Sequence, residues 1–127
     1  MRTIKFRAYD KEDNKMIYDV YPAPNGDMAG DYNGRFCLRM PAERVILEQF
    51  TGLTDKNGKE IYGNDVVRFY VYGSNNSYRG EIIWHDYAWG IKWIDNSGNN
   101  CPKLDYLFEY INDNYEIEVI GNVHKNK

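Results

Sequence analysis

The sequence predicts a mainly β protein with one short helix, and three observations support this fold class. Short segments alternate apolar and polar residues with the period of two that is typical of half-buried strands. Gly, Asn, Asp and Pro separate these segments at short intervals, as they do in chains of antiparallel hairpins. The chain is 16% aromatic and has 12 Tyr, whereas the helix formers Leu and Ala are scarce. We therefore expect a small curled antiparallel sheet or barrel of the SH3-like kind, with an N-terminal β-hairpin extension.

The length of 127 residues fits one domain, or one compact domain with an extension. We expect residues 1–50 to form the N-terminal β extension, with a Pro/Gly loop at 21–35. Residues 51–127 are predicted to form the SH3-like β-barrel domain, including a short helix near 103–112.

The N-terminal segment predicts a hairpin. Residues 3–9 alternate, with Lys5 and Arg7 on the polar face of a half-buried strand. Residues 10–15 are a polar turn, and residues 16–20 are predicted to be the return strand.

The next segment is less regular. Residues 21–35 are rich in Pro, Gly, Asn and Asp, which predicts a loop. Residues 36–40 are predicted to form a short strand that Pro41 stops. For residues 42–50, Ala, Glu and Leu favour helix, whereas Val45-Ile46 and the following hairpin favour strand. We favour the strand.

The centre of the chain carries the strongest turn signals. Asn57-Gly58 lies between short strand-like runs and favours a hairpin with a two-residue turn in which both φ angles are positive. Gly63-Asn64-Asp65 predicts a second bend, because Gly and Asn accept positive φ.

The C-terminal half predicts further strands and one helix. Strands are expected at 66–72, 80–84, 88–94 and 115–123, between Gly- and Asn-rich connections. The segment 102–112 is the best helical candidate because four apolar residues follow the i, i+3, i+4, i+7 spacing, namely Leu104, Leu107, Phe108 and Ile111.

Charge and targeting signals limit the possible partners. The formal net charge is −3 and the sequence has no basic block, which argues against nonspecific binding of nucleic acid. Cys37 and Cys101 belong to no paired motif, so reduced thiols are expected. No signal region follows Met1 and no window approaches transmembrane length. These observations predict a cytosolic protein without a membrane partner.

The sequence contains no convincing catalytic or metal motif. His85-Asp86 could form an oriented base, but adjacent residues on a turn usually point apart. A zinc site is not favoured, because no usual ligand spacing connects its four candidates, His85, Cys101, His124 and Cys37. A calcium loop is matched only loosely, without its central Gly or distal Glu, by Asp10, Glu12, Asp13 and Asn14. We therefore expect no enzyme activity, metal or cofactor.

The aromatic residues suggest a contact surface instead. Trp89 and Trp93 share a strand face with Ile91, which predicts that they pack in the core rather than form a ligand platform with Trp84. The opposite face is the candidate binding face if the strands 66–72 and 88–94 pair. Its residues are Arg68, Tyr70, Tyr72 and Lys92, with Tyr87 at the adjoining turn.

Three separated blocks resemble the YopX family of phage and prophage proteins. They cover residues 4–10, 51–62 and 118–123, in the family's order. One departure is that Gly63-Asn64 stands where members have Glu-Gly, although Asn64 can also adopt the left-handed conformation. The resemblance implies a phage or prophage origin and a mostly β fold. It implies no activity, because the family has none assigned and no catalytic residues to transfer.

Together these observations predict an accessory protein that acts by binding in the cytoplasm of a bacterial host. The expected partners are further copies of the chain, giving a homo-oligomer, or a host protein, because Tyr is favoured at interfaces. The alternative is single-stranded nucleic-acid binding on the Arg/Tyr/Lys face. A hydrolase or metalloenzyme is the third and least supported class.

Overall fold

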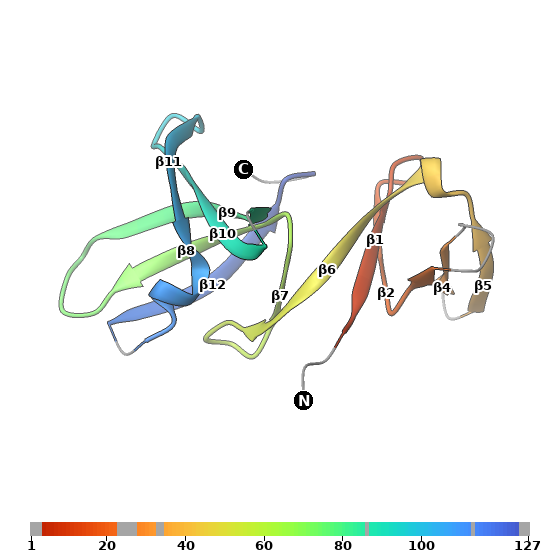
Figure 1. The fold of residues 1–127 in the computed structure, drawn as a ribbon, viewed down its shortest axis with the longest axis horizontal. Coiled ribbons are helices and arrows are strands. Elements are labelled where there is room, and N and C mark those ends of the chain that lie inside the picture. Colours follow the sequence, from red (N-terminus) through yellow and green to blue (C-terminus); the bar gives the residue numbers. More distant parts are fainter. Residues whose placement is uncertain (1–3, 23–27, 33–34, 86, 113, 125–127) are drawn as a thin grey trace. The chain divides into compact units, whose positions relative to one another are not determined.

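The computed structural model of this chain describes residues 4–22, 28–32, 35–85, 87–112 and 114–124. It is mainly β, with antiparallel strands and short 3-10 turns (Figure 1), so the prediction of a mainly β fold is confirmed. The chain divides into two compact units, Met1–Phe50 and Thr51–Lys127. Each unit is described by itself below.

Unit 1 is organised around β1 (Phe6–Asp10). This strand pairs antiparallel with β2 (Lys15–Tyr18) and, on its other side, with the first half of β6 (Val45–Thr54). The predicted N-terminal hairpin is therefore confirmed. A small core packs beneath it, made of Ala8, Ile17, Val20 and Val45.

The prediction that Arg7 lies on a polar face of β1 is wrong. This residue is only 2% exposed, and its Nε donates a 2.7 Å hydrogen bond to Oε1 of the equally buried Glu48. The two residues face each other across β1 and β6. Because a buried charge must be paired, the cross-strand partner allows both faces of β1 to be covered.

The turn after β1 is held by an ion pair. Arg44 donates from Nε and Nη2 to the two carboxylate oxygens of Asp10, at 3.0 and 2.8 Å. The backbone N–H of Glu12 donates to the same carboxylate. The guanidinium of Arg44 is the main reason that the pKa of Asp10 lies below its usual value. The loosely calcium-like segment is thus a turn whose first carboxylate is engaged by arginine.

The loop predicted at 21–35 is wrong in the described residues. Three strands pair antiparallel here, namely β3 (Tyr21–Pro22), β4 (Met28–Tyr32) and β5 (Arg35–Met40). Pairing supplies the backbone hydrogen bonds that composition alone does not suggest. Residues 23–27 and 33–34 of the predicted loop lie outside the described residues.

Residues 42–50 contain both structures that the sequence suggests. A 3-10 turn, η1 (Ala42–Arg44), precedes β6, which begins at Val45. The strand prediction is therefore confirmed from Val45 onward, where the β-branched residues stand.

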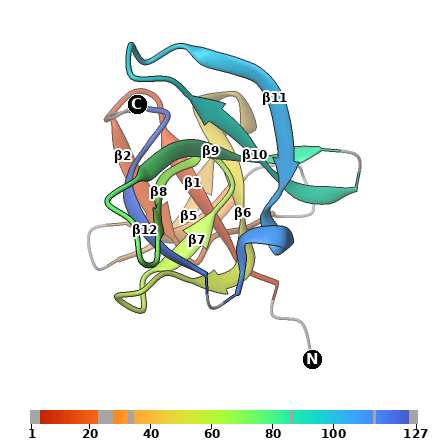
Figure 2. The ribbon, with the colours of Figure 1, turned by 90° about the vertical axis from the view of Figure 1, so that its left-hand side faces the viewer.

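Unit 2 contains a curled five-stranded antiparallel sheet with the order β11-β10-β9-β8-β12 (Figure 2). Before it in the chain, β7 (Glu60–Tyr62) pairs with β6. The strands of the sheet are β8 (Asp65–Val71), β9 (Ser77–His85), β10 (Ala88–Ile94), β11 (Asn100–Tyr106) and β12 (Tyr115–Asn122).

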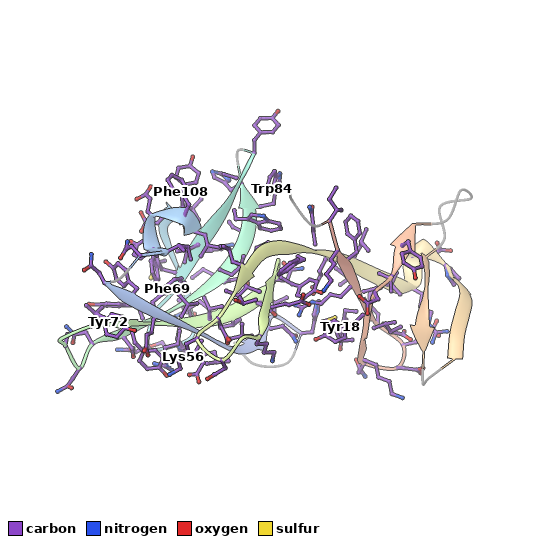
Figure 3. All side chains as sticks on the ribbon, turned by 90° about the horizontal axis from the view of Figure 1, so that it is seen from below. Tyr18, Lys56, Phe69, Tyr72, Trp84 and Phe108 are labelled. Carbon is purple, nitrogen blue, oxygen red and sulfur yellow. The ribbon has the colours of Figure 1, made fainter. Side chains whose placement is uncertain are left out.

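The core of unit 2 fills the concave side of this sheet. Val67, Phe69, Ile82 and Ile91 are fully buried, and Phe69 lies among the strands in Figure 3. Trp89 and Trp93 pack against this core while remaining partly exposed, so the prediction that they join the core is confirmed. Trp84 is 53% exposed.

The predicted helix near 103–112 is largely wrong. Residues up to Tyr106 belong to β11, which pairs with β10, and only η2 (Leu107–Tyr110) forms a single 3-10 turn. The apolar spacing does not mark one buried face, because Leu107 is 1% exposed while Phe108 is 69% exposed (Figure 3). Strand pairing to β10 overrides the helical spacing. In the described residues, no helix has the length and apolar character needed to cross a bilayer.

The two central turns are only partly as predicted. The hairpin around Asn57-Gly58 is present, but its turn spans Asp55 to Lys59. Of Asn57 and Gly58, only Gly58 has a positive φ, at 80°. The two-residue turn is therefore wrong, because Asp55 closes a wider turn with its carboxylate. At the second bend, Asn64 has φ 71°. The expectation that Asn64 adopts the left-handed conformation is confirmed.

Candidate functional site

The unit 2 sheet borders an open groove of about 900 Å³. Residues of β8, β9, β10, β11, η2 and the start of β12 line it. Its aromatic and acidic wall consists of Phe69, Tyr78, Trp93, Asp105, Tyr110 and Tyr115. We call this site the aromatic groove.

Trp93 is the centre of the aromatic wall. Its ring centroid lies 5.3 Å from that of Phe69 and 5.4 Å from that of Tyr110, both in edge-to-face geometry. Tyr78 is 6.3 Å away in the same geometry, and Tyr115 extends the wall at 5.0 Å from Tyr110. Such contacts fix the ring orientations. Tyr78 remains 53% exposed.

A carboxylate is fixed within this wall. Asp105 Oδ2 accepts hydrogen bonds from Trp93 Nε1 at 2.7 Å and from the Tyr110 hydroxyl at 3.1 Å. Burial and the Asp105 carboxylate raise the pKa of Tyr110 to about 12. The Tyr110 hydroxyl therefore keeps its proton at neutral pH and acts as a donor. The two donors fix the orientation of the carboxylate.

Residues of both charges line the rest of the aromatic groove. Arg79 Nη2 donates to the backbone carbonyl of Asp95 at 3.1 Å, and Arg68 Nη1 donates to Ser77 Oγ at 3.0 Å. The carboxylate of Asp95 accepts from two backbone N–H groups of its own turn. Charge is therefore mixed around the groove.

The sequence-predicted binding face is only partly assembled. Strand register places Arg68, Tyr70 and Lys92 on the same sheet face, but β9 separates Arg68 from Lys92. Tyr72 follows β8 and is 56% exposed (Figure 3). Tyr87 is 93% exposed at the β9–β10 turn. This turn is at one end of β9, whereas Ser77, which pairs with Tyr70, is at the other end. The structure thus places Arg68 and Tyr70 on β8 with Tyr72 just after it, and leaves Lys92 and Tyr87 apart from them.

Acidic residues of β12 are the part of this face that the sequence reasoning missed. The hydroxyls of Tyr70 and Tyr72 each donate at 2.8 Å, to Glu118 Oε1 and Glu116 Oε1 respectively. Lys56 Nζ lies 4.6 Å from the Tyr70 ring centroid. The hydrogen bond to Glu118 is the main reason that the pKa of Tyr70 is raised. The alternation of Glu116 and Glu118 in the closing strand was the available signal.

In the part of the chain that the structure describes, the remaining candidate catalytic and metal-binding residues do not come together in one site. In the described residues, no group of three or more His, Cys, Asp and Glu side chains could hold a metal ion. Cys101 is a free cysteine that lines the aromatic groove. Asp86, the proposed partner of His85, and the side chain of Cys37 lie outside the described residues.

The sequence reasoning also missed the aromatic groove itself. The sequence predicts Trp93 in the core, and it gives no reason to single out Tyr78 or Tyr110. The groove depends on the β10–β11 pairing, in which Asp105 faces Ile91. Local patterns do not report such a pairing, although an Asp between apolar residues of a strand was a usable signal.

Comparisons with known proteins place this chain in a family. The family model described as YopX protein matches residues 5–127. The structure resembles the crystal structure of protein EF1440 from Enterococcus faecalis, with 23% identity, a TM-score of 0.61, and coverage of 99% of this chain and 96% of that chain. It also resembles the crystal structure of protein yopX from Bacillus subtilis, with 20% identity, a TM-score of 0.63, and coverage of 99% and 96%. No curated protein matches the chain significantly. Because the family model spans nearly the whole sequence, the chain belongs to the YopX family.

Proposed function

We propose that this YopX-family chain is a phage or prophage accessory protein that acts by binding a protein partner rather than by catalysis. It acts in the cytoplasm of the bacterial host. The partner is a second copy of the chain or a host protein. The single observation that carries the proposal is the aromatic groove of unit 2.

The aromatic groove has the features of a binding site for an extended protein segment. Tyr and Trp dominate the binding energy of protein interfaces because their rigid rings bury large areas at a small entropic cost. Here Trp93 and Tyr110 are held in place by ring contacts and by Asp105. Tyr78 leaves about half its surface available. A wall that is ordered before binding loses little freedom when a partner docks.

The test compares two tyrosines of similar exposure. Tyr78 lines the aromatic groove and is 53% exposed, whereas Tyr21 belongs to unit 1 and is 52% exposed. Self-association is measured by sedimentation of the purified chain, and capture of host proteins by affinity purification from bacterial cells. We expect Tyr78→Ala to weaken the association about tenfold, since truncating such an anchor costs about 1–2 kcal/mol. Tyr21→Ala should leave it unchanged.

Two results would contradict this proposal. One is a strictly monomeric chain that captures no protein from the host. The other is a partner that binds Tyr78→Ala and the wild type equally well, because such a partner would not use the aromatic groove.

The alternative function, single-stranded nucleic-acid binding, draws on Arg68 and Arg79, which are register partners across β8 and β9. Glu116 and Glu118 oppose it, because their carboxylates bind the hydroxyls of the tyrosines that would have to stack on bases. Gel shifts with oligothymidylate at low and high salt test the alternative. We expect no shift even at low salt, where phosphate contacts are strongest.

A further inference from the structure

The two outermost strands of the unit 2 sheet differ in what lies along their outer edges. The Asp55 turn covers the outer edge of β12. Lys56 N–H donates to the Ile117 carbonyl at 2.9 Å, and Val119 N–H donates to Asp55 Oδ2, also at 2.9 Å. β11 is the last strand at the other end of the sheet (Figure 2). In the described part of the chain, β10 is the only strand that pairs with it.

The pairing register fixes which backbone groups of β11 point away from the sheet. Hydrogen-bonded and non-hydrogen-bonded pairs alternate along antiparallel strands, and a residue whose backbone groups do not face one neighbouring strand faces the other. The Ile82 carbonyl on β9 accepts from Asn64, which precedes β8, so Ile82 and its β10 partner Ile91 form a non-hydrogen-bonded pair. The backbone groups of Ile91 therefore face β11. Its partner there is Asp105, whose N–H and C=O face β10 in return.

The same alternation turns the backbone groups of Leu104 and Tyr106 outward. The Tyr106 carbonyl is engaged by η2, because Tyr106 is its N-cap and an N-cap carbonyl accepts the first hydrogen bond of the helix. Three outward groups remain, namely the N–H and C=O of Leu104 and the N–H of Tyr106. Among the described residues, no backbone hydrogen bond outside the strand ladder involves them. Unpaired groups of this kind at a sheet edge are a template for an added strand.

Apolar side chains accompany this open edge. Leu104 is 39% exposed and Tyr106 is 37% exposed, and alternation places both on the sheet face opposite to that of Asp105. The ring of Phe108, which is 69% exposed (Figure 3), lies 6.0 Å from that of Tyr106. On the other face, Asp105 and Cys101 of β11 line the aromatic groove. A strand added to β11 would therefore border the aromatic groove with one set of alternate side chains and cover apolar surface with the other.

A second copy of β11 does not suit this edge. A symmetric pair centred on Asp105 would direct each Leu104 N–H to the Tyr106 carbonyl of the other copy, which is already engaged by η2. A pair centred on Leu104 would include the segment before it. There the β10–β11 register shifts, and Pro102 has no N–H to donate. An extended segment of a different protein meets neither obstacle.

We infer that residues 104–106 of β11 accept an extended segment of a host protein as an added antiparallel strand, with apolar side chains at the two positions opposite Leu104 and Tyr106. This inference rests on the proposed function and describes how the partner is held beside the aromatic groove. Main-chain hydrogen bonds supply affinity in strand addition, and alternate side chains supply specificity. The added strand is antiparallel because the described sheet is antiparallel throughout and this pairing is the more stable one.

The experiment titrates the full chain with acetyl-Thr-Val-Thr-Val-Thr-amide and follows its backbone amide signals by NMR. In the inferred register the two Val residues lie opposite Leu104 and Tyr106, so the Val amides face β11 and the Thr amides face away. Two matched peptides are N-methylated, one at both Val amides and the other at the three Thr amides. We expect the Leu104 and Tyr106 amide signals to shift with the parent peptide and with the Thr-methylated peptide. The Val-methylated peptide should leave them in place.

Two leucines of equal exposure locate the side-chain contact. Leu104 on β11 is 39% exposed, and Leu47 on β6 is 40% exposed. We expect Leu104→Thr to weaken binding of the parent peptide about threefold, as for the loss of one cross-strand pair. Leu47→Thr should bind it like the wild type. Amide spectra without peptide verify that both variants keep their fold.

Several results would overturn the inference. The two N-methylated peptides could act alike, or only the Thr-methylated peptide could fail to bind. Leu104→Thr could bind the parent peptide as tightly as the wild type. Shifts of the Leu104 and Tyr106 amides that depend on protein concentration without peptide would mean that the edge pairs with a second copy, and would overturn the choice of a host protein.

The outcomes also separate this inference from the proposed function. If the peptides contradict strand addition while capture of a protein partner still depends on Tyr78, the proposed function stands and the added strand is wrong. If the peptides behave as expected but no protein partner depends on Tyr78, the open edge of β11 stands as a binding site without the proposed function.

Discussion

Two turns of unit 2 have the same local structure but different surroundings. The turns at Asp55 and Asp95 both place Gly three residues after the Asp, at Gly58 and Gly98. In each turn, the backbone N–H of the Asp donates a 2.8 Å hydrogen bond to the carbonyl of the fifth residue. The Asp Oδ1 accepts hydrogen bonds from the backbone N–H groups of the third and fifth residues. The same five-residue pattern therefore gives the same turn twice.

The difference lies in the long-range contacts. Asp55 is 8% exposed, and its Oδ2 also accepts from the backbone N–H of Val119 on β12 at 2.9 Å. Lys56 N–H donates to the Ile117 carbonyl. Asp95 is exposed and lines the aromatic groove. The comparison teaches that local sequence sets the turn, whereas the neighbouring strand decides whether the turn contributes to the packing of the sheet or borders the aromatic groove.

The largest difference is expected when each Asp loses its carboxylate. Asp55→Ala leaves three backbone N–H groups without their acceptor, so we expect the free energy of unfolding to fall by about 3 kcal/mol. Asp95→Ala should cost about 1 kcal/mol, because the N–H groups of its exposed turn can bond to water. Urea unfolding followed by Trp fluorescence measures both, since all three Trp residues lie in unit 2. Equal losses would contradict the comparison.

A smaller difference is expected for the matched amides. Asp55→Asn can keep Oδ1 as an acceptor, but its amide NH₂ then faces the Val119 N–H, a contact between two donors. We expect a loss of about 2 kcal/mol in the free energy of unfolding. Asp95→Asn should lose less than about 0.5 kcal/mol. Slower amide hydrogen exchange at Val119 in the wild type than in Asp55→Asn would identify the broken bond, and identical exchange would argue against it.

The pH dependence of stability should also separate the two residues. Burial raises the pKa of Asp55, but the hydrogen bonds from Val119, Lys59 and Asn57 together lower it below 3.8. A lowered folded-state pKa stabilises the fold above the unfolded pKa, and this stability is lost as the pH falls through the folded pKa. We therefore expect the stability difference between wild type and Asp55→Asn to shrink from about pH 5 towards pH 2. A constant difference in urea unfolding across this range would contradict the assignment.

The smallest difference is expected at the glycines. Gly58 and Gly98 have φ of 80° and 84°, and a Cβ at either position would meet no atom within 4 Å. Gly58→Ala and Gly98→Ala should therefore each cost about 1 kcal/mol through backbone strain alone. Thermal unfolding should give losses that agree within about 0.5 kcal/mol. A much larger loss at Gly58 would mean that its position near β12 matters beyond the turn.

The parts of the fold that depend on local pattern could be predicted. Alternation found β8 and β10, and turn residues found the hairpin around Gly58 and the bend at Asn64. The failures occurred where pairing across the sheet decides the structure. Arg7 was placed on a solvent face because Glu48 lies 41 residues away, and β4 was hidden by a composition typical of loops.

The aromatic groove was beyond sequence reasoning for the same reason. Trp93, Asp105 and Tyr110 converge only after β11 pairs with β10 and η2 brings Tyr110 to Asp105. Of the predicted face, Arg68 and Tyr70 lie on one side of β8, and Tyr72 follows that strand. The charge of this face was misjudged, because β12 adds Glu116 and Glu118 beside those tyrosines.

The central claim is that the aromatic groove is the surface on which this chain binds its partner. Amide hydrogen exchange of the chain alone and in complex with its captured partner tests it directly. We predict that protection on binding appears in β9, β10 and η2 around Tyr78, Trp93 and Tyr110. Protection confined to the outer face of β8 and β12, around Tyr70 and Glu118, would contradict the claim.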